Sequence, residues 1–394
     1  MSELRLEKNS RTKVELTKKG RFFDYTMLII VIFLCVFGLV MVYSTSSYTA
    51  AIKNGDAAYY FKKQLFSTCV GLVALFAASF IDYHFWNKIK WFIYFSSLVL
   101  VLLVLSPIGV ELNNARRWIH IGPLSFQPVE YVKIALIITL ASFILYSGKK
   151  MKNARNNIAY LIITAIPAAM IYFITNNLSS AIILVGIAYV MLMIGNNKPT
   201  WLIVATIAGV LLIAVFLIVF FRTVESTDRF RFERLLAWRN PKKYASGVGL
   251  QTIQSLYAIG SGGLFGKGLG QSIQKLGFLP EAQNDMIFAI ICEEMGLFGG
   301  ICVILLFMLL IWRFMVIANN APDLFGSLIV VGVMAHIALQ VILNIAVATN
   351  TIPNTGISLP FISYGGTSVV FLMAEMGLVL NVSRQIQVPV AVGK

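Results

Sequence analysis

Charged residues are scarce in this sequence: only 12% of its 394 residues are Asp, Glu, Lys or Arg. Soluble domains average about 25% charged residues, so this shortage excludes an ordinary soluble protein. Acidic residues are the scarcer kind, with 17 against 32 basic residues and a formal net charge of +15. In a chain that is 58% hydrophobic, this excess is first explained by basic flanks of membrane helices and contact with anionic lipid headgroups. Nucleic acid is not an expected partner.

Cysteine and histidine are also rare, with four and three residues. The cysteines lie in or beside apolar runs without paired spacing, which argues against a disulfide framework or a zinc site. His84, His120 and His336 are scattered along the chain, so their spacing builds no metal-binding triad. His336 is most simply a hydrogen-bonded core residue. A cleavable signal peptide is not expected, because residues 1–21 are polar and basic and the apolar run after them is long enough to span.

Long apolar runs dominate what is present. About ten of them can cross a hydrocarbon core of about 30 Å, which predicts an all-α polytopic membrane protein with one large extracytoplasmic loop. The expected spans are 23–44, 65–81, 91–110, 126–146, 158–175, 179–195, 201–221, 286–312, 326–348 and 366–383. We therefore expect a basic cytoplasmic tail at 1–22, a transmembrane domain at 23–384 and a cytoplasmic tail at 385–394.

Basic residues at the ends of the runs predict the orientation, since such residues favour the cytoplasmic side. The residues expected on that side are Lys8, Arg11, Lys13, Lys18, Lys19, Arg21, Lys88, Lys90, Lys149, Lys150, Lys152, Arg155, Lys198, Arg313, Arg384 and Lys394. This assignment puts residues 45–64, 111–125, 222–285 and 349–365 outside.

The segment 222–285 is the candidate active region, because a connector of this length is usually functional or disordered. Disorder is not expected, since apolar residues recur at helical spacing, at Leu250, Ile253, Leu256 and Tyr257. The glycine-rich run 262–270 lacks the Gly-Lys-Ser/Thr of a nucleotide-binding loop, and no strand precedes it. Its glycines favour a bent backbone packed on protein.

Acidic residues in and beside the spans are the candidates for chemistry. Asp285 lies at the outer end of an apolar helix, with Glu281 one turn earlier. Spacing alone favours a carboxylate that interacts with the helix dipole over the alternative, a general base. Glu293, Glu294 and Glu375 fall inside spans, where buried charges usually pair. Structural pairing is the expected role of these three, and a proton or substrate path is the alternative.

A second cluster lies near the outer end of the fourth span. Glu130 and Lys133 are three residues apart and share one helix face. They form either a self-neutralising pair or a lysine aimed at phosphate that Glu130 orients. Arg116 and Arg117 come just before, so three cations converge on one outer patch. This convergence favours a site for a polyanion.

Six stretches carry a recognisable pattern: Asn114-Ala115-Arg116-Arg117-Trp118-Ile119, Phe126-Gln127-Pro128-Val129-Glu130-Tyr131-Val132-Lys133, Gly266-Lys267-Gly268-Leu269-Gly270-Gln271-Ser272, Leu279-Pro280-Glu281-Ala282-Gln283-Asn284-Asp285, Glu293-Glu294-Met295-Gly296, and Pro353-Asn354-Thr355-Gly356 through Leu359-Pro360-Phe361-Ile362-Ser363-Tyr364-Gly365-Gly366. In this order they resemble the SEDS family of shape, elongation, division and sporulation proteins. The motifs extend over nearly all spans, and their style is closer to the FtsW and SpoVE branches than to RodA.

The resemblance implies a peptidoglycan glycosyltransferase that polymerises lipid II on the outer face of the bacterial cytoplasmic membrane, in division, elongation or sporulation. The essential aspartate of the family maps onto Asp285, which makes that residue the expected general base despite its spacing. The expected substrate-binding residues are Arg116, Arg117, Glu130, Lys133, Lys267 and Lys275.

The same resemblance implies partners and a location. Expected partners are lipid II, undecaprenyl-diphosphate-linked glycan, a class B penicillin-binding protein that acts as transpeptidase, other divisome proteins and membrane lipids. A divalent cation, Mg²⁺ or Mn²⁺, is an expected cofactor with unassigned ligands. We expect both termini in the cytoplasm and the protein at the division septum. The alternatives are a lipid II flippase that uses Glu293, Glu294 and Glu375, and a non-enzymatic scaffold that recruits the transpeptidase.

Overall fold

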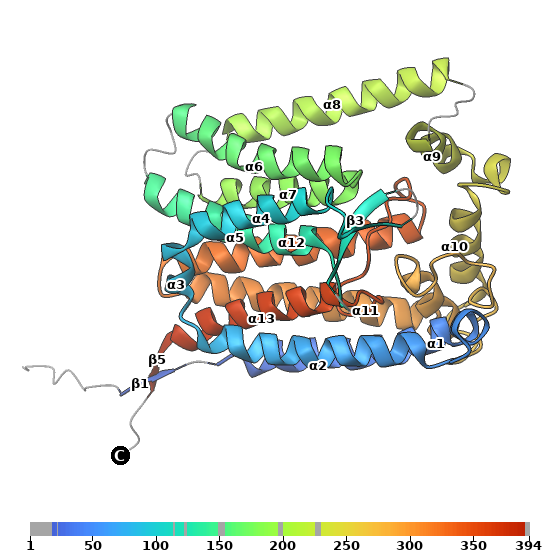
Figure 1. Cartoon of the computed structure of the whole chain (residues 1–394), viewed down its shortest axis with the longest axis horizontal. Coiled ribbons are helices and arrows are strands. Elements are labelled where there is room, and N and C mark those ends of the chain that lie inside the picture. The colour runs from blue at the N-terminus through green and yellow to red at the C-terminus, as the bar shows by residue number, and fades with distance from the viewer. Residues whose placement is uncertain are drawn as a thin grey trace, which may run out of the picture.

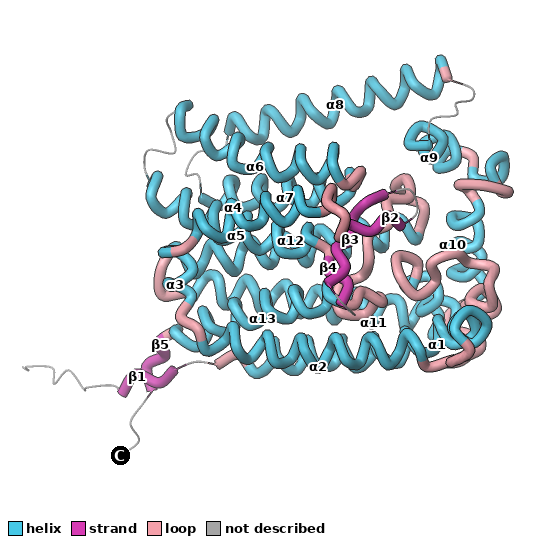
Figure 2. Tube along the Cα trace, viewed as in Figure 1, coloured by secondary structure: helices cyan, strands magenta, loops and turns pink. Residues whose placement is uncertain are grey.

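Long helices that lie side by side make up most of the molecule (Figures 1 and 2). The computed structural model describes residues 18–21, 23–112, 115–121, 124–148, 154–195, 200–224 and 230–390. The helices are α1 (Tyr25–Asn54), α2 (Tyr59–Phe80), α3 (Tyr83–Lys88), α4 (Lys90–Leu103), α5 (Pro128–Ser147), α6 (Ala154–Ile174), α7 (Leu178–Gly195), α8 (Thr200–Thr223), α9 (Phe230–Arg239), α10 (Leu250–Ser261), α11 (Ile287–Asn320), α12 (Leu324–Ala348) and α13 (Thr367–Gln385), with a 3-10 turn at Pro241–Tyr244.

Within the described ranges, nine helices are long and apolar enough to cross a membrane, and the shorter α4 adds a tenth apolar segment. The predicted set of spans and the all-α fold class are therefore confirmed. In Figure 1, β1, β5 and α3 lie at one end of these helices, while β3, α9 and α10 lie toward the other. The predicted outer segments 111–125 and 222–285 thus share one end. The expected cytoplasmic residues Lys8, Arg11, Lys13, Lys149, Lys150, Lys152, Lys198 and Lys394 lie outside the described residues.

Two small antiparallel sheets interrupt the helical fold. Strands β2 (Gly109–Leu112), β3 (Ala115–Ile121) and β4 (Leu124–Phe126) form one, in the order β2-β3-β4. Strands β1 (Lys18–Arg21) and β5 (Gln387–Val390) pair near the termini. Neither sheet was expected, because strands this short do not show a clear alternating pattern. The first sheet carries Arg116 and Arg117.

Helix α1 extends to Asn54, well past residue 44, where the predicted span ends. The polar residues after that point keep the helix intact because their hydroxyls bond to carbonyls one turn earlier. Thr45 Oγ1 donates to Met41 O at 2.8 Å, and Ser46 Oγ donates to Val42 O at 2.6 Å. The helix thereby reaches the loop end of the molecule, where Ser44 joins the candidate site.

At the opposite end of the bundle, Asp82, Tyr83, His84 and Asp323 form a hydrogen-bonded cluster, here called the polar clasp. His84 bridges two aspartates, with Nδ1 2.8 Å from Asp82 Oδ1 and Nε2 2.8 Å from Asp323 Oδ2. Tyr83 donates its hydroxyl to the same Asp323 oxygen at 2.6 Å. Burial alone lowers the pKa of His84, but the hydrogen bonds to Asp82 and Asp323 outweigh it and raise the pKa above 6.5. The clasp ties α3 to the start of α12.

We expect this clasp to make thermal stability depend on pH. Because the folded-state pKa of His84 is raised, its stabilisation is fully present below pH 6.5 and is lost as the pH rises through the folded value. A His84→Gln variant should lack this dependence. The measurement is the unfolding temperature of both proteins in detergent between pH 5.5 and 8.5. A constant difference between them across that interval would contradict the prediction.

Candidate active site

The turn 279–286, just before α11, places Asp285. Its apolar side chains are buried and fix it against the bundle: Leu279, Ala282 and Met286. Two hydrogen bonds hold its backbone. Asn344 Nδ2 of α12 donates to Asp285 O at 2.7 Å, and Ser363 Oγ donates to Asn284 O at 2.5 Å. Asp285 therefore lies where the large loop, α12 and the 349–366 segment meet.

The Asp285 carboxyl is only 9% exposed and has few polar contacts. Gln251 of α10 donates from Nε2 to Oδ1 at 3.1 Å. Gln251 is itself held by Asn354, whose Nδ2 donates to its Oε1 at 2.6 Å. The other oxygen, Oδ2, faces Gly356, where an added Cβ would lie 3.6 Å away. Glycine at this position keeps space open beside Oδ2.

The pKa of Asp285 is raised from 3.8 to about 7. Burial is the largest cause, and repulsion from the Glu281 carboxylate adds to it. A hydrogen bond from the backbone N–H of Asp285, attraction by Arg234 and the hydrogen bond from Gln251 oppose the rise. A carboxyl that titrates near neutral pH is suited to general-base catalysis, because it is both available as a base and strong enough to take a proton.

Arg234 and Gln251 belong to the site but were not among the expected substrate-binding residues. Arg234 of α9 donates from an NH1 nitrogen to Asn354 O at 3.1 Å. Burial lowers its pKa, and the charge of Asp285 raises it in part. Trp238, one helical turn later, donates from Nε1 to Asn350 O at 3.0 Å. The Arg234–Trp238 spacing is a helix-face signal that could have identified the inner face of α9.

The large loop is ordered at α10, as its helical spacing predicted. Small side chains pack inward, and Ser255 Oγ donates to Ala348 O of α12 at 2.7 Å. Two residues of the predicted apolar stripe, Leu256 and Tyr257, are 38% and 57% exposed. Small inward residues allow α10 to lie close to α11 and α12, so the larger apolar residues face outward.

The structure pairs Lys267, an expected substrate cation, with a glutamate. Lys267 Nζ lies 2.7 Å from Glu293 Oε1, and its side chain is 29% exposed. Glu293 is fully buried and also accepts from Ser272 Oγ and from the backbone N–H of Ile273 at 3.1 Å. The predicted pairing of Glu293 is therefore present, and Lys267 is only partly available to a ligand.

Lys275 is likewise engaged. Its Nζ lies 2.8 Å from Glu294 Oε1, and its side chain is 6% exposed. Ser44 of α1 donates to the same carboxylate at 2.7 Å and accepts from Lys275 at 3.0 Å. Lys275 therefore joins the segment after the glycine-rich run to α1 and α11, and the ammonium group expected to bind substrate is paired in this structure.

The backbone of the glycine-rich loop packs against a kink in α11. Gly296 has φ +70° within the helix, so α11 consists of a short buried part up to Met295 and a longer part after it. At Gly266, φ is +81° and an added Cβ would lie 2.2 Å from Glu294 O. Gly268 donates its N–H to Glu294 O at 2.9 Å. The expected bent backbone packed on protein is thus observed.

We predict that Gly266→Ala destabilises the protein by about 2 kcal/mol or more, because it adds backbone strain to a clash with a carbonyl. The matched control is Gly260→Ala in α10, where an added Cβ meets nothing within 4 Å. That variant should be neutral or slightly more stable, since alanine favours a helix over glycine. Thermal unfolding of both variants in detergent measures the difference. Equal unfolding temperatures would contradict the close packing of this loop.

Glu130 and Lys133 belong to a buried network that the sequence spacing shows only in part. Lys133 Nζ lies 2.9 Å from Glu130 and 2.9 Å from His336 Nε2 of α12. His336 Nδ1 is 2.8 Å from Glu375 Oε2 of α13. Lys133 is 2% exposed, so the structure shows the self-neutralising pair and not a lysine aimed at an outer phosphate. The expected core role of His336 and pairing of Glu375 are also observed.

Arg116 and Arg117 lie on β3 but do not converge with Lys133. Arg116 is 49% exposed at its side chain, with Nε 3.5 Å from Glu111 Oε2. Arg117 donates from Nε to Thr175 O at 3.1 Å and from NH2 to Asn176 O at 2.9 Å. Arg117 thus ties β3 to the end of α6, while Arg116 is accessible from the loop end.

The described residues contain no group of three His, Cys, Asp or Glu side chains that could hold a metal ion. Asp285 has Glu281 as an acidic neighbour, and Gln251 and Asn284 offer amides nearby. These donors do not form a complete ligand set of their own. The described residues therefore do not supply all the ligands of a divalent-cation site by themselves.

Sequence comparison places the chain among known proteins. It is 39% identical to stage V sporulation protein E of Bacillus subtilis over 372 residues, which covers 94% of this chain and 99% of that protein. It is 36% identical to the probable peptidoglycan glycosyltransferase FtsW of Trichlorobacter lovleyi over 94% of this chain and 96% of that one. It is 35% identical to the probable peptidoglycan glycosyltransferase FtsW of Bacillus subtilis, with 93% and 92% covered.

Solved structures show the same fold. A chain from a peptidoglycan synthase complex superposes with a TM-score of 0.75 at 24% identity, covering 92% of this chain and 98% of that one. The rod shape determining protein RodA of Thermus thermophilus gives a TM-score of 0.67 at 24% identity, with 92% and 97% covered. The family model for cell cycle proteins of the FtsW, RodA and SpoVE type matches residues 25–388. The chain belongs to this FtsW/RodA/SpoVE family.

Proposed function

We propose that this protein is a peptidoglycan glycosyltransferase that polymerises lipid II at the loop end of the bundle, with Asp285 as general base. The observation that carries the proposal is the buried Asp285 carboxyl, whose pKa of about 7 suits proton abstraction at neutral pH. Relatives that are 34–36% identical over most of the chain are named probable peptidoglycan glycosyltransferases. Their names support the same reaction class.

In the proposed step, Asp285 takes the proton of the acceptor sugar hydroxyl while that oxygen attacks the anomeric carbon of the donor glycan. The bond between this carbon and the diphosphate oxygen breaks, and the undecaprenyl diphosphate leaves with the bonding electrons. Gln251 donates to Oδ1, so we assign the proton to Oδ2, which lies beside Gly356. Because Gln251 holds Oδ1, the carboxyl group keeps one orientation and Oδ2 keeps one direction. A base held in this way contributes to the rate by orientation.

The diphosphate needs cations, and the described contacts favour some of the expected residues over others. Lys133 and Lys275 are neutralised and buried. Arg234 interacts with Asp285 itself, and Arg116 and Lys267 keep exposed surface. We therefore assign the leaving diphosphate to Arg234, with Arg116 and Lys267 as further contacts. Such charges stabilise the negative charge that develops on the leaving group.

The remaining expectations are part of the proposal. A divalent cation, Mg²⁺ or Mn²⁺, would bind with the substrate diphosphate, since the described residues do not supply all of its ligands. The loop end faces outward and both termini lie in the cytoplasm, as the basic flanks indicate. A class B penicillin-binding protein would use the polymer as transpeptidase at the division septum or during elongation or sporulation.

Polymer formation by the purified protein tests the proposal. The full chain, in liposomes with fluorescent lipid II, should produce glycan strands that lysozyme digests. A second arm measures translocation of dye-labelled lipid II across the same liposomes. Translocation without polymer would overturn the proposal in favour of a flippase. Neither activity, with or without the transpeptidase, would leave a scaffold role and overturn it as well.

The contacts of the acidic residues support the enzyme over the flippase. That alternative requires Glu293, Glu294 and Glu375 to exchange partners during transport. Each is instead held by a basic side chain at 2.7–2.8 Å. The first two also lie before the kink at Gly296, at the end of the helix beside the loop, where they fasten that loop.

A further inference from the structure

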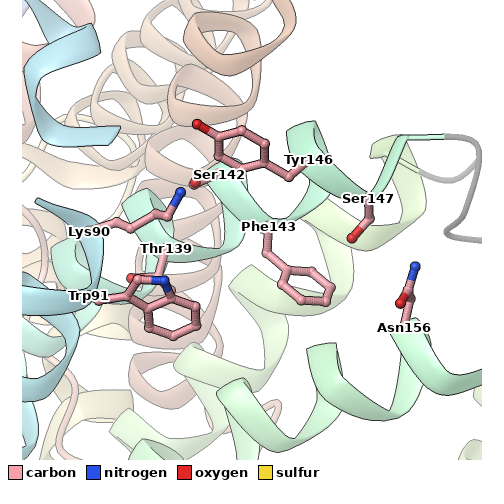
Figure 3. A pocket seen from close by; sticks show the side chains of 8 residues that line it. All are labelled: Lys90, Trp91, Thr139, Ser142, Phe143, Tyr146, Ser147 and Asn156. Atoms are coloured by element: carbon pink, nitrogen blue, oxygen red, sulfur yellow. The ribbon is translucent and has the colours of Figure 1, made fainter. Parts of the chain in front are cut away.

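A cavity of about 320 Å³ lies between α4, α5 and α6. Its lining includes Lys90 at the start of α4 and Ser147 at the end of α5, the helix ends that lie near α3 and away from α9 and α10 (Figure 1). Figure 3 shows its lining, in which an ammonium group, four hydroxyls and an amide lie among aromatic rings. The lining residues are Lys90, Trp91, Thr139, Ser142, Phe143, Tyr146, Ser147 and Asn156. The proposed glycosyltransferase reaction uses none of them.

Lys90 supplies the charge of this pocket. Its Nζ lies 4.0 Å from the centre of the Tyr146 ring and 3.3 Å from Asn87 Oδ1. The Asn87 oxygen also accepts from Ser142 Oγ at 2.7 Å, and Ser142 is fully buried. Within the described residues, none of the ion pairs involves Lys90. A cation beside several donors, without a carboxylate to neutralise it, matches the chemistry of a phosphate group.

Apolar surface continues from the pocket along the helices that flank it. Trp91 is 45% exposed and stacks on Phe95, one turn further along α4, at 6.1 Å between ring centres. Phe95 is itself 58% exposed. On α6, Ile158 and Leu161 are 56% and 50% exposed. In a spanning bundle these faces meet hydrocarbon, and tryptophan and tyrosine favour the headgroup level at the ends of spans.

We propose that this pocket binds the headgroup phosphate of an anionic phospholipid. Lys90 provides the charge, the Ser147 hydroxyl provides a donor, and Trp91 and Tyr146 form the walls. The acyl chains follow the exposed apolar faces of α4 and α6. Basic pockets between spans on the cytoplasmic side are a recurrent form of lipid recognition, and this one lies at the end where the basic flanks gather.

The continuous apolar exit favours a lipid over a soluble phosphate. A phospholipid places its headgroup in the polar pocket and its acyl chains on Trp91, Phe95 and Ile158, which a soluble phosphate does not do. One basic residue near a membrane surface changes lipid binding by about fivefold. The expected effect of removing Lys90 is of that size.

Native mass spectrometry of the full chain tests the proposal. The protein is equilibrated in detergent with equal amounts of phosphatidylglycerol and phosphatidylcholine, and the retained lipids are counted. The test variant is Lys90→Gln, and the matched control is Lys88→Gln, which removes the same charge from an exposed neighbour outside the pocket. Thermal unfolding in phosphatidylcholine alone confirms that both variants are folded.

The wild-type protein and the Lys88→Gln variant should retain phosphatidylglycerol preferentially, and Lys90→Gln should lose about fivefold of that preference. Tyr146→Leu, which keeps apolar bulk but removes the ring, should lose part of it. Equal losses in both lysine variants would mean unspecific attraction and overturn the proposal. Complete displacement of the lipid by soluble glycerol phosphate would also overturn it, because the ligand would then be a soluble phosphate. These outcomes do not depend on the polymerisation assay.

Discussion

Replacing Asp285 with asparagine is expected to slow lipid II polymerisation by about 10²–10⁴-fold, the range that a positioned general base contributes. Asparagine has the same shape and keeps an oxygen to accept the hydrogen bond from Gln251. The loss would therefore arise from the missing base and not from a disturbed fold. Single-turnover rates with labelled lipid II, for protein and variant in the same liposomes, measure it. Activity within a few-fold of the wild-type value would remove Asp285 from the mechanism.

The pH dependence of the rate provides a sharper check of the same role. Asp285 acts in its ionised form, so the rate should rise with pH through a pKa of about 7. Glu281→Gln removes a repulsive charge and should move this rise to lower pH. Arg234→Gln removes an attractive charge and should move it to higher pH. If Asp285 only supported the turn, these two variants would not shift the pH profile of the rate in opposite directions.

The raised pKa also has a cost in stability. Above pH 3.8 the unfolded chain releases the Asp285 proton, whereas the folded chain keeps it up to about pH 7. Stability therefore falls as the pH rises between these values, by as much as about 4 kcal/mol. The Asp285→Asn variant should unfold at a higher temperature than the wild-type protein at pH 8. Catalytic carboxyls held in unfavourable surroundings commonly show this exchange of stability for activity.

The spans could be predicted from the sequence because hydropathy is a local property. Each apolar run of sufficient length must cover its own backbone polar groups, and a helix does this within the segment. Helix ends were harder to place. Ser44 and Thr45 suggest an end to α1, yet their hydroxyls bond within the helix or to Glu294. Whether a polar residue ends a helix depends on a partner that local sequence does not reveal.

In the candidate site, too, local features could be predicted from the sequence and long-range contacts could not. Asp285 could be located because its motif is contiguous, from Leu279 to Asp285. The partners of the lysines could not, since Lys275 and Glu294 are 19 residues apart and Lys133 and His336 are 203 apart. Basic residues in an outer loop predict a polyanion site only if they are unpaired. Here burial of Glu293 and Glu294 requires two of those lysines as counter-charges.

The buried network around Lys133 is expected to be the most sensitive structural element. Lys133→Met should destabilise the protein by about 3–5 kcal/mol, because it leaves Glu130 and His336 without their shared partner inside the bundle. Methionine keeps most of the side-chain volume, so cavity formation contributes little. The measurement is the unfolding temperature in detergent, together with the yield of folded protein in the membrane.

The double variant Glu130→Gln with Lys133→Met separates lost charge pairing from lost packing. Removing both members of a buried ion pair is often close to neutral, whereas removing one leaves an uncompensated charge. The double variant should therefore recover a large part of the stability that Lys133→Met loses. His336 and Glu375 would keep their own contact at 2.8 Å in both proteins, so the difference isolates the Glu130 charge. A double variant as unstable as the single one would show that Lys133 acts through packing or through His336, and that charge balance on α5 is not what the bundle requires.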